Sequence, residues 1–283
     1  MTSTAPVPAN SAGPAHAFTV DLEEWFHGIE LAQADWPTES RLAIGLERLL
    51  RLLHEHGVRA TFFVLGVIAE RHPRMVAELA GAGHEIGCHG HVHQFVYRQS
   101  PEEFRLDVRQ ARGHIGDALG APPRGYRAPY FSIRADSLWA LEILAEEGFA
   151  YDSSVFPVRN NRYGIPDAPR RPYDMVLNSR TLREIPMTVA RVLGTNLPFS
   201  GGAYLRILPW WAQALAWSRA DRAGGPAIAY IHPWELDPDH PRVALRRRVA
   251  ATHYARLRVT ERRLDRLLAG RRFGRLDEVA DYS

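Results

Sequence analysis

Three histidines in the segment CHGHVHQ, at positions 89, 91 and 93, have the spacing of metal ligands. Histidines two residues apart lie on one side of a strand, and histidines four apart lie on one face of a helical turn. Two imidazoles and one carboxylate leave coordination positions for water and substrate, the arrangement of a catalytic metal site. We therefore expect two of these three histidines to bind a cation, with an exposed histidine-rich turn as the alternative.

The segment VDLEEW supplies the acids that such a site needs. In extended backbone Asp21 and Glu23 point to the same side, and Glu24 points to the other. Two acids on one side can divide the work, because one can bind the metal while the other serves as the base for a water. An exposed acidic loop is the alternative interpretation.

Two further polar residues follow apolar runs. Arg127 lies in YRAPY, where a fixed guanidinium beside a carboxylate would keep that carboxylate ionised and oriented. His232 lies in AYIHPWE before Pro233, which favours extended backbone, and a histidine there can protonate a leaving amine. The structural alternatives are that Arg127 connects loops and that His232 is a core histidine.

These residues fall at the ends of predicted strands. The predicted strands are 17–20, 60–66, 84–89, 124–131, 149–155, 183–188 and 227–235. The predicted helices are 40–57, 73–83, 100–120, 135–148, 209–224 and a long basic helix over 243–269. Strands that alternate with helices indicate βα units and a mostly parallel sheet. The absence of a GxGxxG turn after the first strand argues against a dinucleotide-binding fold.

The 283 residues include 46% hydrophobic and 24% charged residues, as in a soluble globular protein. The chain has no lysine, which excludes Schiff-base and P-loop chemistry. Cys88 is the single cysteine, so an internal disulfide and a multi-cysteine zinc site are excluded, and we expect it to be a small buried residue. No motif indicates nucleic-acid binding. Residues 1–16 lack the features of a secretory signal, and we expect a cytoplasmic protein.

Charge is distributed unevenly along the chain. Residues 241–283 hold 12 Arg and 5 Asp or Glu, a net charge of +7, which leaves −4 for the rest of a chain of net charge +3. We expect residues 236–283 to form a basic helical C-terminal segment. It is either a solvated arginine face or a surface for peripheral contact with an anionic membrane.

The motifs taken in order resemble one family over residues 17–235. The acids of VDLEEW, then ATFFVLG, GHEIGCHGHVH, RAPY, YDSS and IHP, are similar to those of the NodB-type polysaccharide deacetylases, carbohydrate esterase family 4. VDLEEWF, SGGAYLRILP and IHPWELD further resemble the branch associated with exosortase-linked exopolysaccharide clusters, whose own C-terminal region would cover 156–283. We expect residues 156–208 to be an insertion that shapes the site.

The resemblance implies a distorted (β/α) barrel of about seven parallel strands that binds a divalent metal, often zinc. The implied reaction is hydrolysis of N-acetyl groups on amino sugars of a polysaccharide or oligosaccharide, here in exopolysaccharide biosynthesis. Carried over to this sequence, the resemblance assigns a base (Asp21), a metal-binding acid (Glu23), two metal-binding histidines (His89, His93), an orienting arginine (Arg127), an oxyanion-binding backbone amide (Tyr130) and a general acid (His232). The family's Ser or Thr after the first histidine is Gly90 here, which removes a hydroxyl that would brace the loop.

Aromatic residues near these motifs suggest where a sugar would bind. Flat apolar faces complement pyranose rings, so we expect Trp25, Tyr130 and Trp234 to line a groove, with Asp152 also on the substrate side. Two other functions stay open. One is a cyclic imide or ureide-type amide hydrolase on the same fold, and the other is a non-catalytic glycan-binding component.

Overall fold

The computed structural model describes residues 16–29, 31, 35–37 and 39–280. Residues 1–15 of the predicted N-terminal lead-in lie outside this range, and His16 opens the first strand. The strands are β1 His16–Leu22, β2 Thr61–Val64, β3 Glu85–Cys88, β4 Gly125–Tyr126, β5 Tyr151–Asp152, β6 Tyr173–Leu177, β7 Arg180–Glu184, β8 Val189–Val192, β9 Thr195–Pro198, β10 Ile228–Ile231 and β11 Phe273–Gly274. The α-helices are α1 Leu42–Glu55, α2 Gly66–Arg71, α3 Pro73–Gly81, α4 Pro101–Leu119, α5 Trp139–Glu146, α6 Gly202–Ile207, α7 Trp210–Arg222, α8 Arg247–His253, α9 Thr260–Ala269 and α10 Leu276–Ala280.

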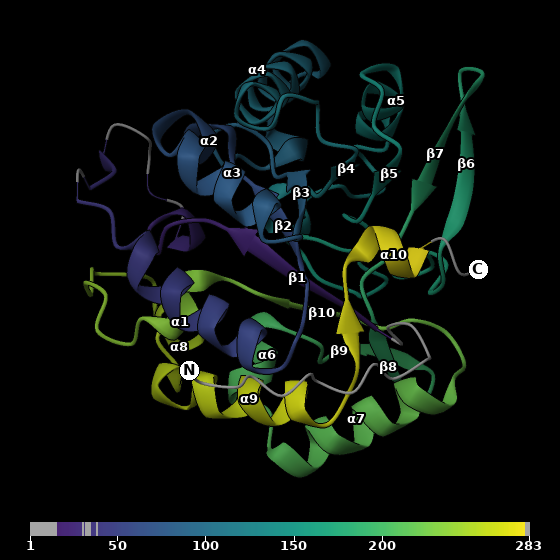
Figure 1. The fold of residues 1–283 in the computed structure, drawn as a ribbon. Helices are drawn as coiled ribbons and strands as arrows, with labels where there is room; N and C mark the ends of the chain where they lie inside the picture. The colour runs from purple at the N-terminus through teal and green to yellow at the C-terminus, as the bar shows by residue number, and fades with distance from the viewer. Residues whose placement is uncertain (1–15, 30, 32–34, 38, 281–283) are drawn as a thin grey trace, which may run out of the picture.

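A mainly parallel sheet runs through the molecule (Figure 1). Its strand order is β10-β1-β2-β3-β4-β5-β7-β6, and all neighbours up to β7 pair in parallel, while β6 pairs with β7 antiparallel. Within the described residues the sheet therefore has a row of seven parallel strands, β10 to β7, as predicted. In such a sheet the carboxyl ends of the strands meet at one edge, where the chemistry of this fold class is located.

The two ends of this row are joined by the chain that follows β7. Thr188 Oγ1 accepts a hydrogen bond from the Ile228 amide at 2.8 Å, and the Ser200 carbonyl accepts one from the Tyr230 amide at 3.2 Å. Gly201 forms a parallel bridge with Tyr230. These bonds connect β10 to the region after β7 and bend the row into a distorted barrel. The predicted insertion 156–208 thus includes β7, one of the parallel strands.

Helix positions follow from the periodicity of apolar residues. In α1, Leu42, Leu46, Leu49 and Leu53 are buried and form one apolar face of the helix. Helix α4 begins with a capping box, because the Ser100 hydroxyl accepts from the Glu103 amide and the Glu103 carboxylate accepts from the Ser100 amide. Cys88 is fully buried in the core, as predicted.

The predicted long helix over 243–269 is wrong. The structure has α8, then the 3-10 turn η6 at Leu257–Val259, then α9. Arg256 adopts a left-handed conformation (φ 54°), which ends helical geometry between the two segments. The break allows the apolar face of α9 to pack into the core through Leu264, Leu267 and Leu268. Periodicity alone could not reveal this, because both halves are separately helical.

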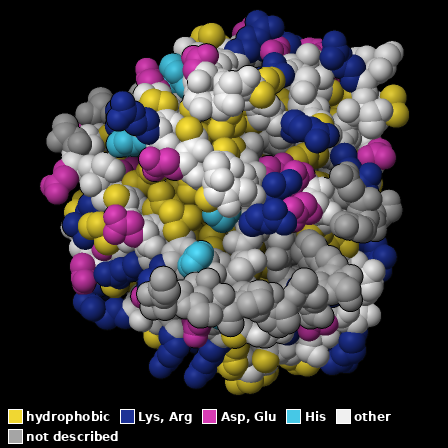
Figure 2. All heavy atoms as spheres, in the orientation of Figure 1, with side chains coloured by type: hydrophobic (Ala, Val, Ile, Leu, Met, Phe, Trp, Pro, Cys, Tyr) yellow, Lys and Arg dark blue, Asp and Glu magenta, His cyan; other side chains and the backbone are white. Residues whose placement is uncertain are grey.

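The basic segment 236–283 is part of the barrel and not an appendage. Strand β11 pairs with the start of β1, and α9 lies beside α1 in Figure 1. Two of its arginines make internal contacts. Arg263 donates to the carbonyls of Leu205 and Leu208 at 2.7 Å, and Arg271 pairs with Asp221 at 3.1 Å. On the face shown in Figure 2, arginines are dispersed among acidic side chains. None of the described helices is long and apolar enough to span a bilayer.

One contact fixes the distance between α1 and the chain that follows β10. A Cβ at Gly45 would lie 1.9 Å from the carbonyl oxygen of Pro233, in the 3-10 turn η5 Pro233–Leu236. We predict that Gly45→Ala lowers the free energy of unfolding by about 1–3 kcal/mol, because a backbone carbonyl cannot yield as a flexible side chain does. Thermal or denaturant unfolding measures this change.

Gly113→Ala is the matched control. Gly113 lies inside α4, and a Cβ there would meet nothing within 4 Å. This variant should gain about 1 kcal/mol from helix propensity. A Gly45→Ala protein that is also more stable than the wild type would show that α1 does not pack as tightly as the structure indicates.

Candidate active site

Residues from several strand ends line one cleft of about 510 Å³. Asp21 lies near the end of β1, His89 directly follows β3, and His232 directly follows β10. The cleft-lining residues that the sequence predicted are Asp21, Glu23, His89, His93, Tyr130, His232 and Trp234. The other residues that line the cleft are Gly28, Phe131, Asn160, Arg162, Tyr163, Gly202, Ala203, Tyr204, Arg206, Ile207, Leu208, Tyr230, Glu235, Val249, Thr252 and His253.

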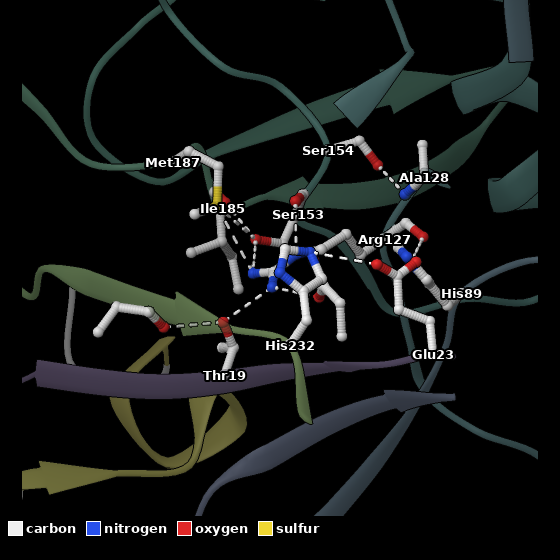
Figure 3. Close-up of polar contacts among 12 residues, drawn as sticks. Thr19, Glu23, His89, Arg127, Ala128, Ser153, Ser154, Ile185, Met187 and His232 are labelled. Atoms are coloured by element: carbon white, nitrogen blue, oxygen red, sulfur yellow. Dashed lines mark hydrogen bonds and ion pairs between the residues drawn. The ribbon is translucent and has the colours of Figure 1, made fainter. Parts of the chain in front are cut away.

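Arg127 is completely buried, and Figure 3 shows its polar contacts. Its Nη1 donates to Asp21 Oδ1 and to Thr19 Oγ1, each at 2.8 Å. Its Nε and Nη2 donate to the carbonyl and hydroxyl oxygens of Ser153, at 3.2 and 3.1 Å. The guanidinium also stacks on the Phe63 ring, 4.2 Å from its centroid. Both predicted interpretations of Arg127 therefore apply, because it orients Asp21 and joins β1 to the end of β5.

Glu23, His89 and His93 form a buried cluster whose candidate ligand atoms all lie within 4.8 Å of one another. His89 Nδ1 lies 2.8 Å from the Arg127 carbonyl, and as the donor of this bond it leaves Nε2 as a lone-pair ligand. His93 Nε2 is 2.5 Å from Glu23 Oε2, yet no donor among the described residues is aligned for a hydrogen bond to that oxygen. Two imidazoles and a carboxylate that converge without hydrogen-bonding geometry fit a divalent cation of the zinc class.

Electrostatics favour the ligand forms of these side chains. Burial alone would raise the pKa of Glu23, but the adjacent His93 and His232 lower it overall, so the carboxylate is ionised. Burial lowers the pKa of His89 to about 4, so its imidazole is neutral at neutral pH. A neutral imidazole and an ionised carboxylate are the forms that bind metals.

Glu24, the third acid of VDLEEW, forms hydrogen bonds at the start of α1. Ser40 Oγ donates to Glu24 Oε1, and the Arg41 amide donates to Oε2 at 3.2 Å. Glu24 thus holds the entry to α1 and does not face the two histidines. This geometry agrees with the choice of Glu23 as the metal-binding acid.

His232 lines the cleft beside Asp21 and Glu23. Its Nε2 is 3.8 Å from Asp21 Oδ2 and 3.5 Å from Glu23 Oε1. Its Nδ1 is 2.8 Å from Glu235 Oε1, and Arg206 Nε holds the other oxygen of Glu235 at 2.6 Å. Burial would lower the pKa of His232, but Glu23 and Glu235 raise it to about 9. At neutral pH the ring therefore carries a proton that it can donate.

The sequence missed Asp107, which braces the loop that carries the metal-binding histidines. Its carboxylate accepts from the amides of His91 at 2.8 Å and Val92 at 3.3 Å. Gly90, whose missing hydroxyl appeared to weaken this loop, has φ 76°, and a Cβ there would lie 3.0 Å from Asp107 Oδ2. Because glycine has no side chain, the Asp107 carboxylate can approach the loop here and brace it in place of the hydroxyl of the family's Ser or Thr. Only the tertiary packing of α4 could have identified Asp107.

Two of the predicted substrate-side residues lie below the cleft surface. Asp152 is completely buried, with Oδ1 accepting from Ser154 Oγ at 2.6 Å, and burial raises its pKa. Trp25 is buried in a cluster with Phe26 and stacks on His240. Neither side chain lines the cleft. This finding corrects the prediction that Asp152 and Trp25 contact the substrate. Both support the surface from beneath.

Trp234 and Tyr130 do line the cleft. The indole Nε1 of Trp234 donates to Glu23 Oε1 at 3.1 Å, so this residue also orients the candidate ligand. Tyr130 adopts a left-handed conformation (φ 56°), and its hydroxyl donates to the His27 carbonyl at 2.5 Å. Strained backbone of this kind is often found at functional sites.

Comparison with known protein families agrees with this geometry. Residues 44–148, which include His89, His93 and Arg127, match the family "Polysaccharide deacetylase". This segment of the chain is therefore similar to polysaccharide deacetylases. Residues 153–281, which include His232, match a domain of unknown function, DUF3473. The candidate general acid therefore comes from the DUF3473 region, whereas Asp21 and Glu23 precede both matched segments.

Curated relatives match about a third to two fifths of the chain. A peptidoglycan-N-acetylglucosamine deacetylase of Bacillus cereus is 34% identical over 96 residues, which are 34% of this chain and 35% of that protein. A chitooligosaccharide deacetylase of Bradyrhizobium is 34% identical over 98 residues, 34% of this chain and 42% of that protein. A peptidoglycan deacetylase of Helicobacter pylori is 30% identical over 40% of this chain and 37% of its own length. The chain thus covers less than half of each of these relatives.

Solved structures share the fold over nearly the whole chain. A protein from Mycobacterium smegmatis assigned as a polysaccharide deacetylase has a TM-score of 0.63 at 22% identity, over 99% of this chain and 94% of that one. An allantoinase has a TM-score of 0.59 at 18% identity, over 99% and 93%. A family 4 carbohydrate esterase from Streptomyces lividans has a TM-score of 0.50 at 17% identity, over 91% and 88%. These likenesses establish the fold.

Asp107 provides a test of how the loop is supported. We predict that Asp107→Ala weakens zinc binding by the Glu23–His89–His93 cluster about 10- to 100-fold, because groups behind metal ligands fix their orientation. Competition with a chromophoric chelator measures the affinity. Asp107→Asn keeps one acceptor oxygen, so its zinc affinity should lie between those of the wild type and Asp107→Ala.

Asp117→Ala is the control, because Asp117 is exposed on the same helix. It should bind zinc as the wild type does. Equal affinity in Asp107→Ala and Asp117→Ala, with both proteins folded by circular dichroism, would contradict the bracing role.

Proposed function

We propose that this protein is a metal-dependent hydrolase that removes N-acetyl groups from amino-sugar residues of a polysaccharide or oligosaccharide. The observation that carries the proposal is the arrangement of acid, base and ligand cluster around one cleft. Asp21, oriented by buried Arg127, and His232, held by Glu235, both lie beside the Glu23–His89–His93 cluster. A module that only binds glycan needs neither an oriented base nor a protonated histidine.

Asp21, His232 and the backbone amide of Tyr130 have separate roles in the proposed reaction. Asp21 Oδ2 is the free oxygen of a carboxylate whose Oδ1 is held by Arg127, so it can take a proton from the attacking water. His232 is protonated at neutral pH and can pass its Nε2 proton to the departing amine. We assign the oxyanion to the backbone amide of Tyr130, which lies at the cleft in a sharp turn.

A divalent cation, which we propose to be zinc, would be held by Glu23, His89 and His93 and would supply Lewis-acid polarisation of the acetyl carbonyl. The surrounding residues keep these ligands in place. Trp234 donates to Glu23 Oε1, and the Arg127 carbonyl accepts from His89 Nδ1. Ligands oriented from behind in this manner are typical of catalytic metal centres.

The walls of the cleft support a glycan substrate. Tyr130, Tyr163 and Trp234 line it, and aromatic faces of this kind complement the apolar faces of pyranose rings. The similarity of VDLEEWF and IHPWELD to sequences from exopolysaccharide clusters leads us to propose an exopolysaccharide or its oligosaccharide precursor as the natural substrate. A cytoplasmic location remains part of this proposal.

Asp21→Asn tests the assignment of the base. We predict at least a 100-fold loss of kcat with unchanged zinc content, because general-base catalysis contributes about 10²- to 10⁴-fold. Acetate release from N-acetylated chitooligosaccharides and metal analysis are the measurements. Asp117→Asn, an exposed change of the same kind on α4, should retain full activity.

The same assay distinguishes the alternative functions. The protein would be reassigned if it hydrolyses a cyclic imide or ureide and releases no acetate from any N-acetylated glycan. The proposed substrate class would then be a cyclic imide or ureide. Normal deacetylation by Asp21→Asn would remove Asp21 from the mechanism.

A further inference from the structure

A second group of ligand-type side chains lies on the outer side of the same loop. Glu70 from α2, His91 from the loop and His114 from α4 present ligand atoms that all lie within 4.8 Å of one another. The rings of His91 and His114 are nearly parallel, at 16°, with centroids 5.5 Å apart. His91 is not among the residues that line the catalytic cleft. The three histidines of CHGHVHQ therefore face two different places.

The backbone around His91 is fixed on both sides. The amides of Gly66 and Val67, at the start of α2, donate to the carbonyls of Gly90 and His91 at 2.9 and 3.2 Å. On the other side, the His91 amide donates to Asp107 of α4. The position of the ring thus depends on α2 and α4 together, so it is set before any ligand binds.

Close packing at Gly66 brings the other two side chains to the same corner. A Cβ at Gly66 would lie 2.5 Å from His91 Nδ1 and 2.7 Å from the Cα of Ala111. Glu70 lies four residues beyond Gly66 on α2, and His114 lies three residues beyond Ala111 on α4. Residues three or four apart share a helix face, so each helix presents its ligand beside the contact point.

The chemistry of this corner suits a cation. His91 Nδ1 is buried without a hydrogen-bond partner among the described residues, although burying an unpaired polar atom costs free energy. Two imidazoles and one carboxylate select borderline-soft ions such as Zn²⁺, Co²⁺ and Ni²⁺. Mg²⁺ and Ca²⁺ prefer oxygen ligands only. Glu70 is exposed and the two histidines are half-buried, so a bound ion would keep open positions for water.

We propose that Glu70, His91 and His114 form a second binding site for a divalent transition metal, separate from the catalytic cluster. The bound ion joins α2, α4 and the loop between His89 and His93. The site is weaker than the catalytic one, because its ligands are more exposed and fewer groups orient them from behind.

Calorimetric titration of the metal-free, tag-free protein with zinc or cobalt tests the proposal. We expect two equivalents in the wild type, one tight and one weaker. His114→Ala and Glu70→Ala should each weaken the second equivalent at least tenfold, while the tight equivalent and the rate of acetate release stay unchanged. The His89→Ala/His93→Ala variant should show the reverse and lose the tight equivalent only.

His54→Ala controls for adventitious binding to surface histidines, since His54 is exposed on α1. It should bind two equivalents as the wild type does. A single equivalent in the wild type, or a second equivalent that survives both His114→Ala and Glu70→Ala, would overturn the proposal. Neither result depends on the substrate, so failure here is distinguishable from failure of the deacetylase function.

Discussion

Burial of the Arg127 guanidinium is the constraint on which the rest of the site depends. A buried charge is tolerated only when it is paired and fully hydrogen-bonded, and removal of one partner of such a pair costs about 3–5 kcal/mol. Here the compensation comes from Asp21 and Thr19 on β1 and from Ser153 after β5, while the carbonyl of Arg127 itself orients His89. One residue thereby sets the positions of the proposed base and of a metal ligand.

The C-terminal half of the chain completes the site. The matched deacetylase segment contains the two histidine ligands and Arg127, but His232 and the residues that hold it, Glu235 and Arg206, lie in the DUF3473 region. That region also closes the barrel through Thr188 and Ser200. In this chain the DUF3473 region is therefore part of the same fold as the matched deacetylase segment.

Local patterns predicted much of this and failed where tertiary packing decides. Alternating strands and helices, the Ser100 capping box and polar residues at strand ends are local signals, and they indicated the parallel sheet and the residues of the cleft. The break at Arg256, the bracing by Asp107 and the burial of Trp25 and Asp152 depend on contacts distant in sequence. Sequence spacing likewise grouped His91 with His89 and His93, whereas in the structure His91 packs against Gly66 and lies beside His114.

The most direct test of the central claim is the metal content of the Glu23–His89–His93 cluster. The measurement is best made in a His114→Ala background, so that only this cluster is probed. The protein would be stripped, reloaded with zinc, dialysed and analysed by mass spectrometry, with and without His89→Ala/His93→Ala. The account predicts one retained zinc per chain in the parent and none in the variant carrying both changes. A parent that retains no metal, or a variant that still retains one, would contradict it.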